Sequence, residues 1–265
     1  MKQKIFYRRV YIRDCEKSNP HFNALFDIFR LTLKPDMLFR EFTAYYYSKR
    51  LDYIDATFVF FDGKVIGFCA AAFYRSVINE KKYVIGRAAT GILESYRGQA
   101  MPKWKLYKKY ICYWIRHPFK NIILSAYVAN PIIYAMICKY TGIAYPRENA
   151  KPPENIIELK NELLRSQNLH RKEEKPFVVE IHFSVKIADK DKKRIFESKD
   201  GAVKYFLHIN PKFIRQYGVV VIIPVSLKNI LLSSFKFLYH YSVKFLLISV
   251  KLFHFRPEIE RNYFN

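Results

Sequence analysis

The feature that most constrains the fold is the order of strand-like and helix-like segments over residues 5–146. A strand pattern is followed by two helix patterns, three consecutive strand patterns, a helix, a strand and a helix. Asp62-Gly63 separates the first two of the three consecutive strands, and this dipeptide is typical of a two-residue turn between antiparallel strands. This order predicts one mixed α/β sheet flanked by helices.

Capping and turn residues set the expected boundaries of these elements. Asn130-Pro131 is a typical helix start, and Gly142 is a typical residue just beyond a helix end. Gly86 and Gly91 interrupt one strand pattern and indicate a bulge or a close backbone approach. We expect strands over residues 5–12, 56–61, 64–74, 83–94 and 122–128, and helices over 22–33, 37–50, 103–116 and 132–140.

Prolines at positions 146, 152 and 153 mark a boundary in the chain. We therefore divide the sequence into an α/β domain, residues 1–150, and an α+β extension, residues 151–265. In the extension, the pattern predicts a helix over 154–166, strands over 177–187, 203–209 and 219–223, and a long helix over 227–255.

Positive charge is concentrated in two stretches of the chain. The formal net charge is +23, and residues 95–147 and 201–257 contain nine and eight Lys or Arg, respectively, with no Asp or Glu. Fields of this sign attract polyanions such as nucleotide phosphates, acidic lipids or nucleic acid. Because no recognised nucleic-acid motif is present, nucleic acid is the less favoured partner.

Other features narrow the chemistry and the expected location. The chain has four Cys without a CxxC pair, and its seven His show no metal-ligand spacing, so we expect no metal site. Separated thiols of this kind are typical of a reducing compartment. The first residues contain no apolar run typical of a signal peptide, so we expect a cytoplasmic protein.

Two segments carry a resemblance to a known family. Glu94-Ser95-Tyr96-Arg97-Gly98-Gln99-Ala100 is similar to the pyrophosphate loop, Arg/Gln-x-x-Gly-x-Gly/Ala, of the GCN5-related N-acetyltransferase (GNAT) superfamily. The segment from Ser125 to Pro131, followed by a helix and Gly142, is similar to the family's second cofactor segment. With the three-strand meander before them, residues 5–146 resemble this superfamily. The resemblance implies a mixed, mostly antiparallel sheet and an N-acyltransferase that uses acetyl-CoA or another acyl-CoA on an unidentified acceptor.

The resemblance also implies a cofactor site. The pantetheine arm would lie beside residues 88–93, and the pyrophosphate would bind at the following loop and helix start, where unpaired backbone N–H groups and the helix dipole favour an anion. The lysines at 103, 105, 108 and 109 add positive charge there. Ala100 and Pro102 stand where the family usually has Gly. The implied cofactor-binding residues are Leu93, Arg97, Gly98, Gln99, Ala100, Met101, Lys103 and Asn130, although Asn130 is equally suited to capping its helix.

Acyl transfer from a thioester needs a base for the attacking amine and an acid for the leaving thiolate. Glu94, at the end of a central strand, is the candidate general base, and the alternative is a solvated carboxylate next to Arg97. Tyr134 and Tyr140 are the candidate acids, and a structural role is the alternative for both. The family's usual position for this acid, four residues before the helix-ending Gly, is occupied here by Cys138.

The long C-terminal helix pattern has a narrow polar stripe and a wide apolar face. At 100° per residue its polar side chains occupy a stripe of roughly 80°, and nearly all other positions are apolar. Charges near the middle of the helix disfavour a single membrane span. Packing on the domain, homodimerisation, and peripheral contact with an anionic membrane through residues between Ser226 and Phe255 all stay open. The polar residues are Asn229, Ser233, Lys236, His240, Lys244 and Lys251.

A second functional hypothesis follows from the same charge pattern. A GNAT-like fold without catalysis would serve as a binding module for an anionic membrane, nucleic acid or a protein partner, because a fold does not by itself imply an activity.

Overall fold

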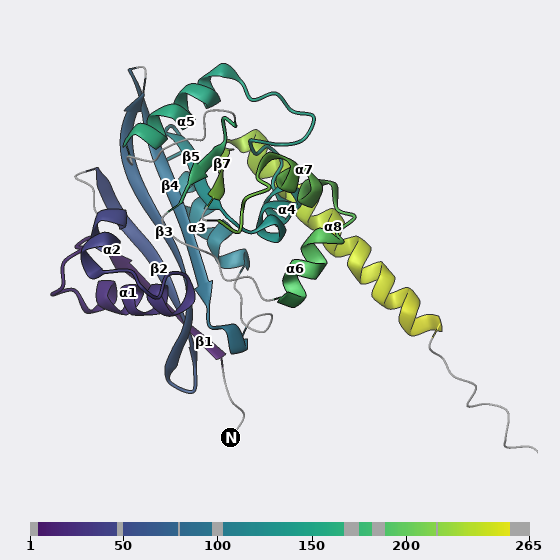
Figure 1. Cartoon of the computed structure of the whole chain (residues 1–265), viewed down its shortest axis with the longest axis horizontal. Coiled ribbons are helices and arrows are strands. Elements are labelled where there is room, and N and C mark those ends of the chain that lie inside the picture. Colours follow the sequence, from purple (N-terminus) through teal and green to yellow (C-terminus); the bar gives the residue numbers. More distant parts are fainter. Residues whose placement is uncertain are drawn as a thin grey trace, which may run out of the picture.

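The computed structural model describes residues 5–46, 50–78, 80–96, 103–166, 175–181, 189–215 and 217–254. Within these ranges the strands form one seven-stranded sheet in the order β1-β2-β3-β4-β5-β7-β6 (Figure 1). All neighbours are antiparallel except β4 and β5, which are parallel. The strands are β1 (Ile5–Ile12), β2 (Leu51–Phe61), β3 (Lys64–Ile78), β4 (Lys81–Ile92), β5 (Asn121–Val128), β6 (Val178–Glu180) and β7 (Tyr217–Val225).

The predicted fold class is confirmed, including the meander. Phe61 pairs with Lys64, so only Asp62 and Gly63 form the turn between β2 and β3. Both turn residues have positive φ, 47° and 73°, which is the backbone of the turn that matches the twist of a hairpin. The dipeptide therefore sets the register of the first two strands of the meander.

Helices cover both faces of the sheet. The first face carries α1 (Pro20–Thr32), α2 (Phe39–Tyr46) and α5 (Glu154–Ser166). The second face carries α3 (Lys103–Arg116), α4 (Pro131–Tyr140) and α7 (Gly201–Ile209). The remaining helices are α6 (Asp189–Phe196), the short 3-10 turn η1 (Glu94–Tyr96) and the long α8 (Leu227–His254).

Some expected boundaries are wrong. Residues 201–209, expected as a strand from position 203, form α7, because the Asp200 side chain accepts hydrogen bonds from the backbone N–H of Ala202 and Val203 and caps a helix there. Within the strand expected over 177–187, the described residues form β6, and residues 182–188 lie outside the described part. Within the expected helix over 37–50, the described residues form α2, which begins at Phe39; residues 47–49 lie outside the described part, and β2 begins at Leu51.

The sheet continues across residue 150. β7 pairs with β5, and β6 pairs with β7, although both strands come after that position in the chain. The division into residues 1–150 and 151–265 stays a prediction about folding units.

α8 turns the first part of its polar stripe, Asn229, Ser233 and Lys236, toward the protein. Ile143 N donates to Asn229 Oδ1 at 2.6 Å, and Gly142 N donates to Ser233 Oγ at 2.9 Å. Lys236 Nζ donates to the carbonyl oxygen of Thr141 at 3.0 Å. These three side chains of α8 therefore bind backbone groups of the turn after α4, and Arg147 also donates to the carbonyl oxygen of Thr141 at 3.0 Å. None of the helices in the described ranges is long and apolar enough to span a membrane.

Replacing Asn229 tests this attachment. The side chain is 3% exposed, and it also donates to the carbonyl oxygens of Ile143 and Pro224. We expect Asn229→Ala to lower the free energy of unfolding by about 2–3 kcal/mol, because buried backbone groups lose their partners. Urea unfolding measures the change. The exposed Asn121, which donates one bond to Lys82 O, provides the control variant Asn121→Ala. Equal losses in both variants would contradict the attachment.

Candidate active site

The sheet forks between its two parallel strands. β4 and β5 pair from Tyr83 with Asn121 as far as Arg87 with Ser125. Beyond that point β4 stays paired with β3 up to Ile92, and β5 stays paired with β7 up to Val128. Residues 88–92 and 126–128 therefore border a gap, with alternate backbone N–H and C=O groups of each strand directed toward it.

Both arms of the fork end at the same edge of the sheet because the strands are parallel. On the first arm, Leu93 N donates to Ile66 O at 2.9 Å, and η1 follows. On the second arm, Asn130 caps α4, with its Oδ1 accepting from Ile132 N at 2.9 Å. Gly91 is required beside the first arm, since a Cβ there would lie 2.1 Å from Thr32 Oγ1 of α1. The atoms nearest this position belong to the side chains of Thr32 and Phe68, so they are not the bulge or close backbone approach that was expected at Gly91.

The structure describes only some of the predicted cofactor residues. Arg97, Gly98, Gln99, Ala100 and Met101 lie outside the described residues, and Lys103 is the first residue of α3, with a side chain that is not described. Leu93 is half-buried against the first face of the sheet. The capping role of Asn130 is observed, and its contact with a cofactor stays a prediction.

The candidate catalytic residues differ in their surroundings. Glu94 is exposed and begins η1, directly beyond the first arm of the fork. Tyr134 is fully buried, and its hydroxyl donates to Pro146 O at 2.8 Å. Burial, reinforced by Cys138, raises the pKa of Tyr134 well above its usual range. Tyr140 packs against Phe237 of α8. Both tyrosine contacts correspond to the structural alternative, and catalytic roles stay predictions.

Sequence reasoning missed a cationic cluster at the base of the fork. The Arg87 guanidinium lies over the rings of Tyr45, Tyr127 and Tyr74, at 4.2, 5.6 and 5.8 Å from their centroids. Arg87 also donates to Tyr45 O at 2.9 Å. Ser125, its partner in the register, is 2% exposed. The only available signal was a single arginine within an otherwise uncharged stretch of a central strand.

This cluster has unused hydrogen-bonding capacity. The hydroxyls of Ser125 and Tyr46 are buried and have no hydrogen-bond partner. Among the described residues, Arg87 forms no ion pair with a carboxylate. A cation and two unpaired hydroxyls at the base of the gap fit a polar or acidic group better than an apolar one.

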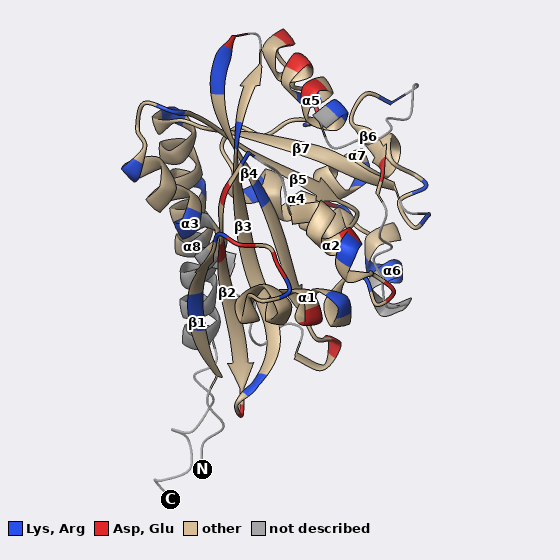
Figure 2. Ribbon diagram, turned by 90° about the vertical axis from the view of Figure 1, so that its left-hand side faces the viewer, with Lys and Arg blue, Asp and Glu red and all other residues tan. Residues whose placement is uncertain are grey.

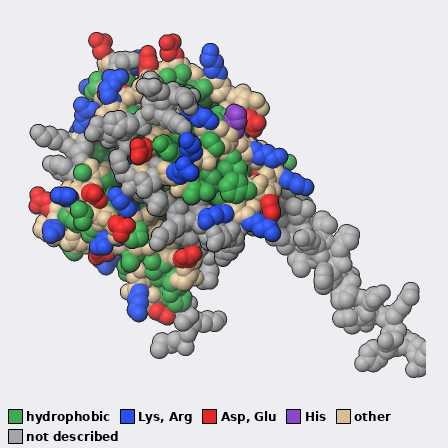
Figure 3. All heavy atoms as spheres, viewed as in Figure 1, with side chains coloured by type: hydrophobic (Ala, Val, Ile, Leu, Met, Phe, Trp, Pro, Cys, Tyr) green, Lys and Arg blue, Asp and Glu red, His purple; other side chains and the backbone are tan. Residues whose placement is uncertain are grey.

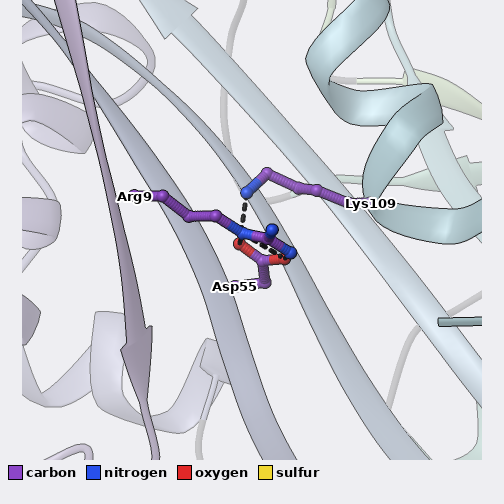
Figure 4. Close-up of polar contacts among 3 residues, drawn as sticks. All are labelled: Arg9, Asp55 and Lys109. Atoms are coloured by element: carbon purple, nitrogen blue, oxygen red, sulfur yellow. Dashed lines mark hydrogen bonds and ion pairs between the residues drawn. The ribbon is translucent and has the colours of Figure 1, made fainter. Parts of the chain in front are cut away.

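A second charged cluster fixes α3 on the sheet (Figure 4). Asp55 of β2 is 1% exposed, and it accepts from Arg9 Nε of β1 at 3.0 Å and from Lys109 Nζ of α3. Burial lowers the pKa of Lys109, and the hydrogen bond to Asp55 opposes that effect. Lys109 was expected near the cofactor phosphates. That expectation is wrong, because its ammonium group is buried against Asp55.

Comparisons with known proteins add a distant likeness of fold. No family model matches the chain, and no curated protein matches it. A solved structure of a probable N-acyltransferase from Enterococcus faecalis, of otherwise unknown function, shares 8% identity over 52% of this chain and 33% of its own, with a TM-score of 0.36. An aminoglycoside N-acetyltransferase, AAC(6')-Iy, solved with CoA, shares 13% identity over 65% of this chain and 91% of its own, with a TM-score of 0.29.

A GCN5-related N-acetyltransferase from Kribbella flavida shares 16% identity over 53% of this chain and 34% of its own, with a TM-score of 0.30. This chain spans about a third of the Enterococcus and Kribbella structures. All three TM-scores are below 0.5, so these likenesses carry no argument here, and the function proposed below rests on this chain's own residues. Among the described residues, no group of three or more His, Cys, Asp or Glu could hold a metal ion.

Neutralising Asp55 tests the anchor of α3. We expect Asp55→Asn to lower the free energy of unfolding by about 3–5 kcal/mol, because the buried Lys109 ammonium loses its charged partner. Adding Lys109→Met should recover part of that loss, and a double-mutant cycle in urea measures the coupling. Asp52, on the same strand, pairs with the exposed Arg75, so Asp52→Asn should cost less than about 1 kcal/mol. Strictly additive effects at Asp55 and Lys109 would contradict a coupled anchor.

Proposed function

We propose that this protein is an acyl-CoA-dependent N-acyltransferase. The observation that carries the proposal is the fork, in which β4 and β5 separate after Arg87 and Ser125. Strand edges of this kind offer backbone donors and acceptors to an amide-rich chain, and the pantetheine arm of CoA has two amides. The resemblance of residues 94–100 and 125–131 to GNAT cofactor segments supports the same site independently.

The residues at the edge of the fork suit the rest of the cofactor. Arg97 to Met101 follow the first arm in sequence, and α3 begins shortly after them at Lys103. Backbone N–H groups at a helix start bind phosphates, and the lysines of α3 lie in a helix without Asp or Glu (Figure 2). When bound, acyl-CoA would supply an activated thioester carbonyl for attack by an amine.

The protein's own side chains would then transfer protons and orient the acceptor. Glu94, exposed at the end of the first arm, would accept a proton from the attacking amine. Arg87 with Ser125 and Tyr46 would orient a polar or acidic part of the acceptor at the base of the gap. The acid that protonates the leaving thiolate would be Tyr140 or Tyr134.

A second candidate is a GNAT-like binding module without catalysis. One observation favours it: the hydroxyl of Tyr134 already donates to Pro146 O inside the core. In such a protein the fork would still bind a cofactor or an anionic ligand, and turnover would be absent.

Cofactor binding is the first test. Acetyl-CoA at about one hundred times its Kd should add about 2.7 kcal/mol of stability, which raises the melting temperature by several degrees in thermal unfolding. Arg97→Glu should remove this shift, because it places a negative charge beside the pyrophosphate. Arg215→Glu makes the same change at an exposed position and should keep the shift. Absence of a shift in the unmodified protein at millimolar acetyl-CoA would reject the proposed site.

Turnover separates the two candidates. Released CoA can be measured with a thiol reagent over a panel of amines, including amines that carry a carboxylate for Arg87. Glu94→Gln should lower kcat roughly a hundredfold while the acetyl-CoA thermal shift stays the same, because only proton transfer is removed. The exposed Glu16 provides the control Glu16→Gln. A thermal shift without turnover on any amine would favour the binding module.

A further inference from the structure

The first part of α8, from Leu227 to Tyr239, presents a largely apolar face to solvent. Its exposed large side chains repeat at helical spacing and lie within an arc of roughly 140° at 100° per residue. Leu238 and Tyr239, for example, are 60% and 67% exposed. Figure 1 shows the helix leaving the body of the protein, with its C-terminal part extended away from the sheet. The exposed apolar residues are Leu227, Leu231, Leu232, Phe235, Leu238 and Tyr239.

This orientation is the reverse of the usual one for a surface helix, which buries its apolar side. The reason is local. Asn229, Ser233 and Lys236 are held by backbone groups after α4, and this fixes the rotation of the helix about its axis. The apolar arc on the opposite side therefore faces outward because of contacts on the inner side, and its side chains are exposed within the described part of the chain.

We infer that the outward face of α8 docks this protein onto an anionic lipid surface as a peripheral helix. A helix of 28 residues that lies in the interface inserts its apolar side between lipid headgroups, and nearby cations attract acidic lipids. The inference is independent of the acyltransferase proposal.

Charge favours lipid over a second copy of this chain. Residues 201–257 contain eight Lys or Arg and no Asp or Glu, so two copies facing each other through α8 would bring like charges together. Lys228 is exposed on α8 itself. In Figure 3 several Lys and Arg side chains lie around the point where α8 leaves the body. Burial, with help from Lys139 and Lys236, lowers the pKa of His240, in agreement with a positive local field.

Co-sedimentation of the full chain with vesicles tests the inference. Vesicles of phosphatidylcholine with about 30% phosphatidylserine should bind the protein at least about tenfold more tightly than pure phosphatidylcholine. Leu238→Glu should weaken binding to the mixed vesicles by about tenfold or more, because a leucine no longer enters the lipid.

Leu31 supplies a matched control. It is 67% exposed on α1, which packs on the first face of the sheet, so Leu31→Glu makes the same chemical change away from α8. We expect this variant to bind vesicles as the unmodified protein does. The inference would be overturned if Leu238→Glu bound the vesicles as tightly as the unmodified protein does, or if binding did not depend on phosphatidylserine. A dimer in sedimentation velocity that Leu238→Glu dissociates, without vesicle binding, would assign the face to a second copy.

Discussion

The parallel pairing of β4 with β5 covers only the stretch from Tyr83 to Arg87, and the candidate active site depends on where it stops. Each strand has a different neighbour on its outer side, β3 for β4 and β7 for β5. Since adjacent strands in a sheet are rotated relative to one another, two strands held by different neighbours separate once their own pairing ends. The gap, the start of η1 and the start of α4 therefore meet at one edge.

The cluster formed by Asp55, Arg9 and Lys109 helps to position that edge of the sheet through α3, although it lies away from the edge. A buried carboxylate contributes to a fold only where charged partners compensate its loss of hydration, and here the partners come from β1 and α3. The pairing holds α3 against strands far from the fork. Because α3 begins directly after the proposed phosphate loop, the same pairing positions the start of that helix. Lys109 contributes through position and not through contact with phosphate.

In α8, hydrogen bonds to backbone groups determine which side of the helix faces inward, although this orientation exposes apolar side chains. A buried amide or carbonyl without a partner costs about 1–3 kcal/mol, and the turn after α4 has several of them to satisfy. Asn229 and Ser233 form hydrogen bonds with these groups. In the resulting orientation of the helix, a row of leucine and aromatic side chains is exposed to solvent. The fold thereby creates an apolar surface within one of the two acid-free basic stretches of the chain.

The sequence by itself determined what depends on neighbouring residues: the Asp62-Gly63 turn, the Asn130 cap, the limits of α5 and the order of elements that predicts the sheet. Local pattern failed at α7, where an apolar run suits a strand or a helix equally well. Three features were decided only by the tertiary structure: the placement of tyrosine rings around Arg87, the pairing of Asp55 with Lys109, and the side of α8 that faces inward. Most of these contacts join residues far apart in the sequence: 42 positions from Tyr45 to Arg87, 54 from Asp55 to Lys109, and 91 from Gly142 to Ser233. Local spacing leaves several faces and partners equivalent, and burial and hydrogen bonding in the assembled fold select among them.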